Sequence, residues 1–397
     1  MDYFNNNVPS EIQLDIFSRV PAEFIRDPTL VCKSWNNLIH HPSFSRIHLH
    51  RINHNDSGKV GFLASTKYID AQEFKYFEYN HNHESTTPIE RIKRVNLKTA
   101  FYRTSICICN PITREHIILP KIQFCDTNRA MWSSGFGYVS STNEYKVVGI
   151  RVSPLMTTIT EVHIYTLGSG NGWRNLGKFD IDFGQNCLKQ GVFANGALYW
   201  IGGKNLGMII TFDLADEHFC KHLSPPVFPP NGNWVLNGIG VLDGFLYFAV
   251  LLATQGEGGI FYDIWLLEKK NDLKVPEGDE LFGWTKKYRL EERNLVAVTK
   301  SNGVLTYSRN YLNIYGPKAS TSEMLLDLKE WIREIYPHKN TLVSLKELGE
   351  EDVEIMESIE IEKTENYDSP LLHPDEVEAV DTLVSLKELI TGKKIGR

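Results

Sequence analysis

The chain has 397 residues, of which 42% are hydrophobic and 23% charged, and its net charge is −7. Residues 341–397 hold 15 acidic and 6 basic side chains, which leaves 34 acidic and 36 basic side chains for residues 1–340. The larger part is nearly neutral and offers no basic field for nucleic acid. The sequence has neither the features of a signal peptide nor an apolar run as long as a membrane span, so we expect a protein of the cytosol or nucleus without membrane contact.

Three short helices are predicted within residues 8–49. Ser10 and Gln13 form a capping-box pattern at the start of a helix over about 10–19. Asp27-Pro28 provides an N-cap and a first-turn proline for a second helix over about 28–39, and a third follows a later proline. Such a short segment buries little surface alone, so it needs a partner or a neighbouring domain.

Motifs in this region resemble the F-box. They are Val8-Pro9-x-Glu11-Ile12, Ile16-Phe17-x-Arg19-Val20-Pro21, Leu30-Val31-Cys32-Lys33-x-Trp35-x-x-Leu38-Ile39, Pro42-x-Phe44 and His48-Leu49. The resemblance implies a three-helix module over residues 1–50 that docks on the Skp adaptor of a Skp–cullin–F-box ubiquitin ligase. It assigns adaptor contact to Val8, Pro9, Ile12, Ile16, Val20, Pro21, Val31 and Trp35. From the pattern alone, a helical cap packed on the next domain is an equal alternative.

From about residue 100 the chain consists of short apolar runs separated by turn signals. The clearest hairpin turns are Asn195-Gly196, Asp243-Gly244 and Asn302-Gly303, with a degenerate fourth at Ser141–Asn143. Each hairpin is followed by two more strand-like runs, and the turns recur at intervals of about fifty residues, which is typical of β-propeller blades. We therefore predict a mainly β fold, with a small helical N-terminal module ahead of a propeller-like domain over residues 55–348.

This β region also resembles the F-box-associated and kelch-like domains of plant F-box proteins. The residues that carry the resemblance are Cys109-Asn110-Pro111-x-Thr113-Arg114-Glu115, Phe136-Gly137-Tyr138, Tyr145-Lys146-Val147-Val148, Val162-x-Ile164-Tyr165, Trp173-Arg174, Gly191–Trp200 and Ile210-x-Phe212-Asp213. The resemblance implies that the propeller binds a target protein.

Candidate target-binding residues are sought on loops, because insertions over one face of a propeller carry function. The loop candidates are Asn128–Ser134, Gly168–Gly172, Pro229–Trp234 and Thr254–Gly259. Trp132 and Trp234 are the preferred anchors, since each is expected in a polar loop rather than in a strand. The alternative for each is a tryptophan that folds back onto the domain.

The sequence indicates no catalytic, cofactor or metal site. It contains no phosphate-binding glycine loop, no zinc-protease motif and no nucleophile elbow. The acid pairs Asp180/Asp182 and Asp213/Asp216 are interpreted as strand ends and turns. Cys107 and Cys109 share one strand face and are interpreted as core residues. The histidines between His40 and His83 are interpreted as surface or linker residues.

The C-terminal part contains an exact duplication. Thr341-Leu-Val-Ser-Leu-Lys-Glu-Leu348 recurs at Thr382–Leu389. The first copy is expected to complete the domain, after a late strand and a short helix within Glu323–Tyr336. Residues 349–397 are expected to form an acidic, solvated, disordered tail, or alternatively a regulatory or partner-binding tail.

The sequence therefore predicts a non-catalytic, substrate-recognition subunit of a ubiquitin ligase. Its partners would be a Skp-type adaptor, through it a cullin, and a target protein. Two rivals remain: a propeller that binds a glycan or small ligand without ligase assembly, and a propeller hydrolase or epimerase whose acids or histidines converge on a central channel.

Overall fold

The computed structural model describes residues 8–20, 22–25, 32–39, 41, 43–45, 47–48, 51, 59–68, 71–80, 88–96, 106–122, 131–153, 159–184, 190–202, 208–227, 234–252, 261–269, 282–291, 294–299, 302–316, 322–338, 341–361 and 382–385. The chain divides into two compact units, each treated by itself below. The first unit comprises residues 1–119 and 333–388, and the second comprises residues 120–332 and 389–397. This division does not follow the predicted boundaries, because the helical module and the first strands belong to one unit.

Almost all of the regular structure is β, as predicted. The helices are short and lie near the N-terminus: α2 (Ser10–Phe17), the 3₁₀ turn η1 (Ala22–Phe24) and α4 (Lys33–Ile39). Residues 43–45 and 47–48 are also helical. No helix in the described part of the chain is long and apolar enough to cross a membrane.

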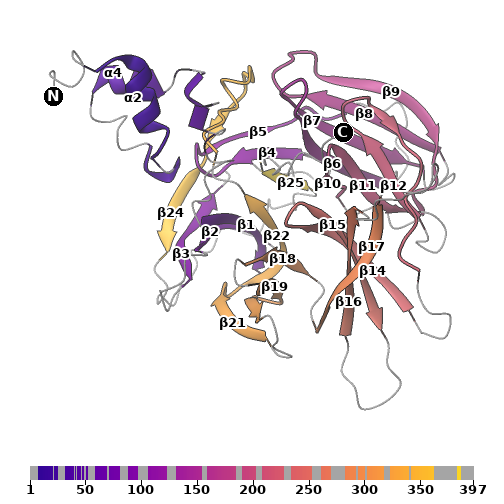
Figure 1. Ribbon diagram of the computed structural model, residues 1–397. Coiled ribbons are helices and arrows are strands. Elements are labelled where there is room, and N and C mark those ends of the chain that lie inside the picture. Colours follow the sequence, from indigo (N-terminus) through magenta and orange to yellow (C-terminus); the bar gives the residue numbers. More distant parts are fainter. Residues whose placement is uncertain are drawn as a thin grey trace. The chain divides into compact units, whose positions relative to one another are not determined.

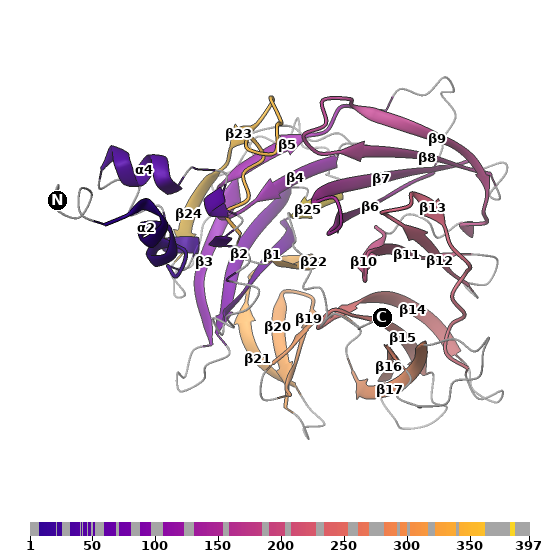
Figure 2. The ribbon, with the colours of Figure 1, turned by 45° about the horizontal axis from the view of Figure 1, so that its top comes forward.

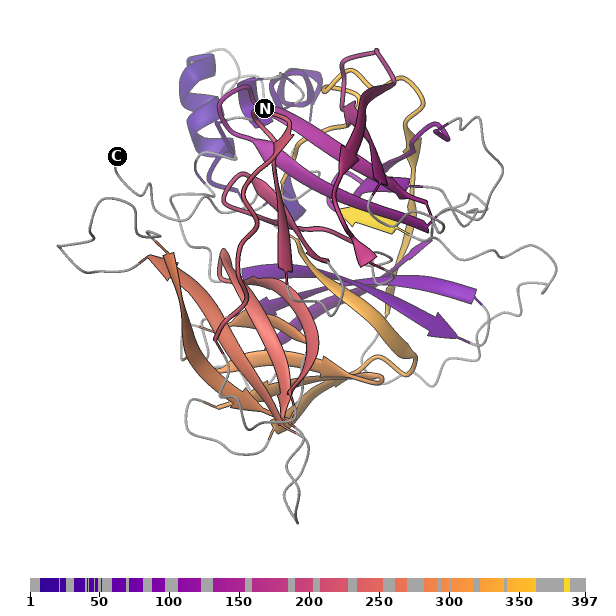
Figure 3. The ribbon, with the colours of Figure 1, turned by 90° about the vertical axis from the view of Figure 1, so that its right-hand side faces the viewer.

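The second unit contains four antiparallel sheets, each made of four strands in chain order (Figures 1 and 3). Their strands are β6 (Met131–Val139), β7 (Glu144–Val152), β8 (Ile159–Thr166) and β9 (Trp173–Asp180); β10 (Val192–Ala194), β11 (Ala197–Gly202), β12 (Met208–Asp213) and β13 (His218–Phe219); β14 (Trp234–Leu242), β15 (Phe245–Leu252), β16 (Phe261–Lys269) and β17 (Phe282–Leu290); and β18 (Leu295–Val298), β19 (Val304–Ser308), β20 (Tyr311–Tyr315) and β21 (Ser322–Asp327).

Successive sheets of this unit pack face to face. The first strands are neighbours, with β10 between β6 and β14, and β14 beside β18. Buried apolar side chains fill each interface, for example Ile164, Leu198 and Phe212 between the first two sheets, and Ile264 and Val304 between the last two. This is the packing of propeller blades, none of which buries both faces alone.

The first unit contains two further sheets (Figure 2). One has the order β22-β1-β2-β3-β24 and the other has the order β23-β5-β4-β25. The strands are β1 (Lys59–Tyr68), β2 (Ala71–Asn80), β3 (Ile89–Asn96), β4 (Ile106–Asn110), β5 (Glu115–Ile118), β22 (Trp331–His338), β23 (Glu354–Ile355), β24 (Glu357–Ile361) and β25 (Thr382–Ser385). Leu63, Phe74, Val95, Cys107 and Met356 belong to one buried apolar cluster that joins the two sheets.

The C-terminal region departs from the sequence prediction in two ways. The predicted late helix is strand, because β21 and β22 occupy this stretch. The predicted tail also contains three strands, of which β23 and β24 pair with β5 and β3, and β25 pairs with β4. Paired backbone therefore extends to Ile361, twelve residues beyond the expected start of the tail at 349, and occurs again in β25. Residues 362–381 and 386–397 lie outside the described part.

Candidate adaptor-binding and target-binding surfaces

Helix α2 begins at Ser10 with Pro9 as its N-cap residue. The predicted capping box is wrong in detail, because no side chain caps this end. Gln13 instead donates from Nε2 to the carbonyl of Val8 over 2.8 Å. Gln13, which was expected to cap the first turn, therefore links the helix to the residues that precede it.

The helical module has its own apolar core. Its buried members are Phe17, Ile25, Ile39 and Phe44, against which Leu14, Val20, Trp35, Leu38 and Leu342 pack. The rings of Phe17 and Trp35 meet edge to face with centroids 4.8 Å apart, a favoured geometry for aromatic pairs. Buried His48 donates from Nε2 to the carbonyl of Val20 over 2.8 Å, so its interpretation as a surface histidine is wrong.

The carboxylate of Asp15 links helix α2 to Arg51 at the end of the module. Asp15 accepts hydrogen bonds from Arg19, at 2.8 Å, and from Arg51. The hydrogen bond from Arg19, followed by that from Arg51, holds the pKa of Asp15 below its usual value. The group is exposed, so these contacts orient the end of the module more than they stabilise it.

Two isoleucines of α2 face away from this core. Ile12 and Ile16 are 52% and 42% exposed, and their spacing of four residues places them on one side of the helix. Phe24 and Ile47 are also exposed, at 38% and 37%. Large apolar side chains of a short helical module that remain in water are candidates for a protein interface.

Comparison with known families decides what this module is. The F-box domain model matches residues 6–47, and the model of the F-box associated beta propeller domain matches residues 49–237. The chain carries an F-box followed by an F-box-associated β-propeller domain.

Similar proteins come from Arabidopsis thaliana. F-box protein At3g49450 is 25% identical over 67% of this chain and 71% of that protein. F-box protein CPR1 is 24% identical over 81% of this chain and 82% of that protein. F-box protein At1g53790 is 25% identical over 53% of this chain and 52% of that protein. The matched parts thus span from about half to four-fifths of these relatives' own lengths.

The predicted adaptor-binding residues of the F-box fall into three groups. Ile12, Ile16 and Pro9 are exposed and Val8 is half-buried, so these four are accessible. Val20 and Trp35 pack on the module's core, where they hold the F-box together. Pro21 and Val31 lie outside the described side chains. Phe24 and Ile47 were not singled out as adaptor-binding residues from the sequence, because Phe24 lies in η1 and Ile47 in a later helical segment, outside the helical spacing of Ile12 and Ile16.

The predicted target-binding tryptophans of the propeller domain do not lie in loops. Trp132 is in β6 opposite Arg151, and its half-buried ring lies over Gly149, whose added Cβ would be 3.0 Å from it. Trp234 is the first residue of β14 and pairs with Leu252. The prediction that both sit in loops is wrong, and for Trp132 the alternative of a ring packed on its own domain is correct.

Three of the four candidate loops lie wholly or partly outside the described part of the chain. Residues 128–130, 228–233 and 253–260 lie outside the described part. Gly168–Gly172 forms the turn from β8 to β9, with Gly168, Gly170 and Gly172 at positive φ.

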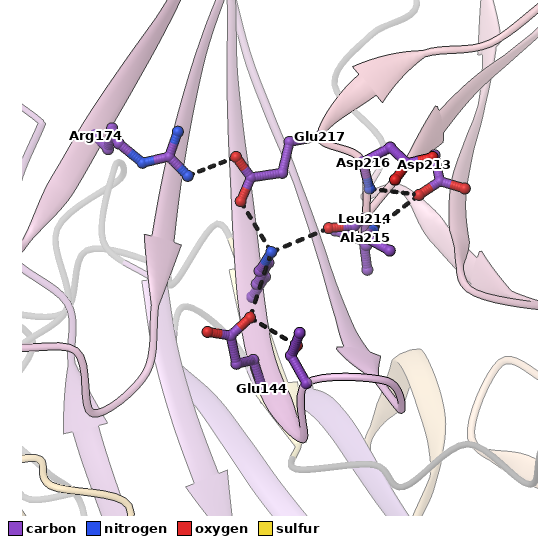
Figure 4. A network of polar contacts seen from close by, with 9 residues as sticks. Glu144, Arg174, Asp213, Leu214, Ala215, Asp216 and Glu217 are labelled. Atoms are coloured by element: carbon purple, nitrogen blue, oxygen red, sulfur yellow. Dashed lines mark hydrogen bonds and ion pairs between the residues drawn. The ribbon is translucent and has the colours of Figure 1, made fainter.

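A polar network joins the first two blades of the second unit (Figure 4). Lys146 of β7 donates to Glu217 over 2.9 Å and to the carbonyl of Leu214 over 3.2 Å. Arg174 of β9 reaches the other oxygen of Glu217 at 2.5 Å. Burial alone would raise the pKa of Glu217, but the hydrogen bonds from Arg174 and Lys146 outweigh it and lower the pKa. The network joins the two blades, because Lys146 and Arg174 of one sheet both bind Glu217 of the next. Since these charges already have protein partners, the network is interpreted as structural and not as a ligand site.

The acid pairs serve turns, as interpreted from the sequence. Asp182 accepts the backbone N–H of Gly184, and Asp213 accepts those of Ala215 and Asp216 at 2.8 and 2.9 Å. Within the described residues, no group of three or more His, Cys, Asp or Glu side chains could hold a metal ion. Cys107 and Cys109 are buried apolar neighbours in the first unit.

Proposed function

We propose that the chain is the substrate-recognition subunit of a Skp–cullin–F-box ubiquitin ligase, acting in the cytosol or nucleus. The F-box would hold a Skp-type adaptor, and the propeller domain would hold a target protein. An F-box together with a propeller domain is the architecture of a substrate receptor of this type. The chain itself would form or break no bond, and would act by raising the local concentration of target lysines near a ubiquitin-loaded enzyme.

The observation that carries the proposal is the pair of exposed isoleucines on α2. Phe17 of the same helix is buried in the module's core, whereas Ile12 and Ile16 remain in water one turn apart. Covering both in an interface would remove their apolar surface from water, which favours association by about 25 cal/mol per Å². Packing within the F-box does not explain Ile12 and Ile16, because neither belongs to the module's core. Contact with an adaptor would explain why both are apolar.

Co-purification with a Skp-type adaptor tests the proposal. Wild type is expected to bind, and the double variant Ile12→Asp/Ile16→Asp is expected to bind at least about a hundredfold more weakly, because two charges would enter an apolar interface. Ile159→Asp is the matched control, since Ile159 is an isoleucine of β8 with 39% exposure. Circular dichroism checks that all three proteins are folded.

Two results would contradict the proposal. If folded wild type does not bind the adaptor, the propeller acts without ligase assembly, as in the glycan-binding or small-ligand alternative. If the double variant binds as well as Ile159→Asp, adaptor contact does not run through α2. Where binding holds, comparing protein levels between cells that express wild type and the double variant identifies targets by their accumulation.

A further inference from the structure

The first copy of the duplicated segment, Thr341–Leu348, lies in a polar and apolar cradle of the first unit. Asn110, at the end of β4, donates from Nδ2 to the carbonyls of Thr341 and Val343, each over 2.9 Å. Glu115, at the start of β5, accepts the hydroxyl of Ser344 at 2.8 Å and the backbone N–H of Leu345 at 2.6 Å. The sheet thus binds the backbone of this segment as a receptor binds a peptide.

The same segment also contacts the F-box. Ser45 donates from Oγ to Glu347 over 2.9 Å, and Leu342 packs on the F-box core. Thr341 and Leu345 are fully buried. The cradle is therefore defined by Asn110, Glu115, Ser45 and the F-box core, and the segment in it connects the F-box to the β4–β5 sheet.

Every side chain that makes these contacts occurs again in the second copy. Residues 382–389 repeat residues 341–348 without a substitution, so Leu383, Ser385, Leu386 and Glu388 correspond to Leu342, Ser344, Leu345 and Glu347. The second copy can form the same hydrogen bonds and the same apolar contacts, because these depend only on the eight residues that the copies share.

The second copy is also held close to the cradle. Its first four residues form β25, which runs parallel to β4 and beside it (Figures 1 and 2). The pairing ends with Ser385 opposite Cys109, one residue before Asn110 of the cradle. To occupy the cradle the segment must give up this pairing, but because it belongs to the same chain it competes at a high effective concentration.

The residue that follows each copy distinguishes them. Gly349 follows the first copy at a φ of 102°, and its N–H closes the turn by donating to the carbonyl of Lys346 over 3.0 Å. Ile390 follows the second copy. A β-branched residue is disfavoured at such a φ, so the same turn is more costly for the second copy. This explains why the first copy occupies the cradle.

We propose that the cradle is a docking site for the sequence Thr-Leu-Val-Ser-Leu-Lys-Glu-Leu and that the second copy can replace the first. With the first copy bound, two residues separate β22 from the segment that holds the F-box. With the second copy bound, residues 339–381 separate them. If the chain is the proposed receptor, exchange would loosen the coupling between F-box and sheets; the exchange itself does not depend on that function.

A double-variant experiment on the full-length chain tests the exchange. Leu386→Asp is expected to leave the melting temperature unchanged. Leu345→Asp is expected to lower it by less than the double variant Leu345→Asp/Leu386→Asp, because the intact second copy takes over. In Leu345→Asp, hydrogen exchange of the amides of residues 386–389 is expected to slow by about tenfold or more, because Leu386 and Leu389 would take over the hydrogen bonds that the amides of Leu345 and Leu348 make in the first copy. The proposal is overturned if Leu345→Asp alone is as damaging as the double variant, or if exchange at 386–389 does not slow.

A gentler pair of variants leaves the cradle untouched. Gly349→Ile gives both copies the same following residue, and is expected to move hydrogen-exchange protection from residues 345–348 towards 386–389. Gly349→Asn is the milder control, because asparagine adopts positive φ more readily than a β-branched residue, and is expected to move the protection less than Gly349→Ile does. Equal patterns for the two variants would overturn the role assigned to Gly349. Neither readout involves the adaptor, so failure here is distinguishable from failure of the proposed function.

Discussion

The indole Nε1 of Trp200 donates a hydrogen bond of 2.9 Å to the hydroxyl of Ser133. Trp200 belongs to β11 and Ser133 to β6, so the bond crosses from one blade to the next. The ring is 3% exposed, and a Cβ at Gly191 would overlap it. The absence of a side chain at Gly191 thus makes room for a tryptophan whose polar atom is satisfied in the neighbouring sheet.

This bond predicts a specific loss for Trp200→Phe. The substitution keeps an aromatic ring, removes this buried hydrogen bond and creates a small cavity, so it should lower the free energy of unfolding by about 1–3 kcal/mol. Urea unfolding followed by circular dichroism measures it. Trp284→Phe is the control: its Nε1 donates to the carbonyl of Ser224 at the surface, where water replaces the bond. Equal losses for the two variants would mean that the buried bond contributes nothing.

Asp263 predicts an acid-sensitive contribution to stability. Its nearly buried carboxylate accepts hydrogen bonds from Arg289, at 2.7 Å, and from Lys286. Burial alone would raise the pKa of Asp263, but these two hydrogen bonds outweigh it and hold the pKa below the ordinary value of 3.8. A lowered folded-state pKa contributes stability that is fully present above 3.8 and is lost as the pH falls through the folded-state value.

Asp263→Asn should therefore be less stable than wild type by about 1–3 kcal/mol near pH 7, and the difference should shrink once the pH falls below about 4. Urea unfolding between pH 7 and pH 3 measures both. Glu268→Gln is the control, because the ion pair between Glu268 and Lys287 at 2.9 Å on the same sheet is more exposed and should contribute under about 1 kcal/mol. A difference that does not change with pH would exclude the ion pair as its cause.

The hairpins could be predicted from the sequence because their chemistry is local. Asn195 and Gly196 have φ values of 50° and 82°, and Asp243 and Gly244 have 50° and 81°, the left-handed pair that a two-residue hairpin requires. Asn302 is also left-handed, at 61°, but β18 and β19 are joined by five residues. The turn residue was identified correctly there, and the loop length was not.

Strand β2 was missed because its alternation is broken: Phe74-Lys75-Tyr76 and Phe77-Glu78-Tyr79 each alternate, but the two halves are out of phase. Its residues 74–79 are all buried, including Lys75 and Glu78, and the pairing with β3 shifts between Tyr76 and Glu78. A register shift inside a strand interrupts the period of two by which strands are recognised. The burial of Lys75 and Glu78 depends on the elements that pack on β2, so it cannot be predicted from the ten residues of the strand.

The duplicated octapeptide shows more clearly that local sequence alone does not determine conformation. Residues 341–344 are irregular and residues 345–348 form a turn, whereas residues 382–385 of the second copy form a strand. Identical local sequence thus adopts two conformations, and the difference comes from what each copy meets and from the residue that follows it. No reading of the eight residues alone could assign them, although Asn110 and Glu115 were already singled out in a family motif.

The F-box core predicts a second way to lose adaptor binding. Phe44 is fully buried in the helical module, so Phe44→Ala should cost about 3–5 kcal/mol and unfold or loosen the F-box. Phe24→Ala is the control, because Phe24 is 38% exposed and its truncation should leave the fold intact. Hydrogen exchange of α2 and α4 is expected to accelerate in Phe44→Ala alone. Protection that is unchanged by Phe44→Ala would contradict the packing described for this module.

The buried thiols of β4 predict a pattern of alkylation. Burial raises the pKa of Cys107 well above its ordinary value and that of Cys109 to about 12, so neither is a thiolate at pH 8 and neither is accessible. Cys32 and Cys220 are partly exposed. Iodoacetamide at pH 8 should therefore modify Cys32 and Cys220 in the folded chain, and Cys107 and Cys109 only in urea, as followed by peptide mass spectrometry. Modification of Cys107 at the rate of Cys220 without denaturant would show that the two sheets of the first unit open in solution, and that their shared core is not the closed cluster described here.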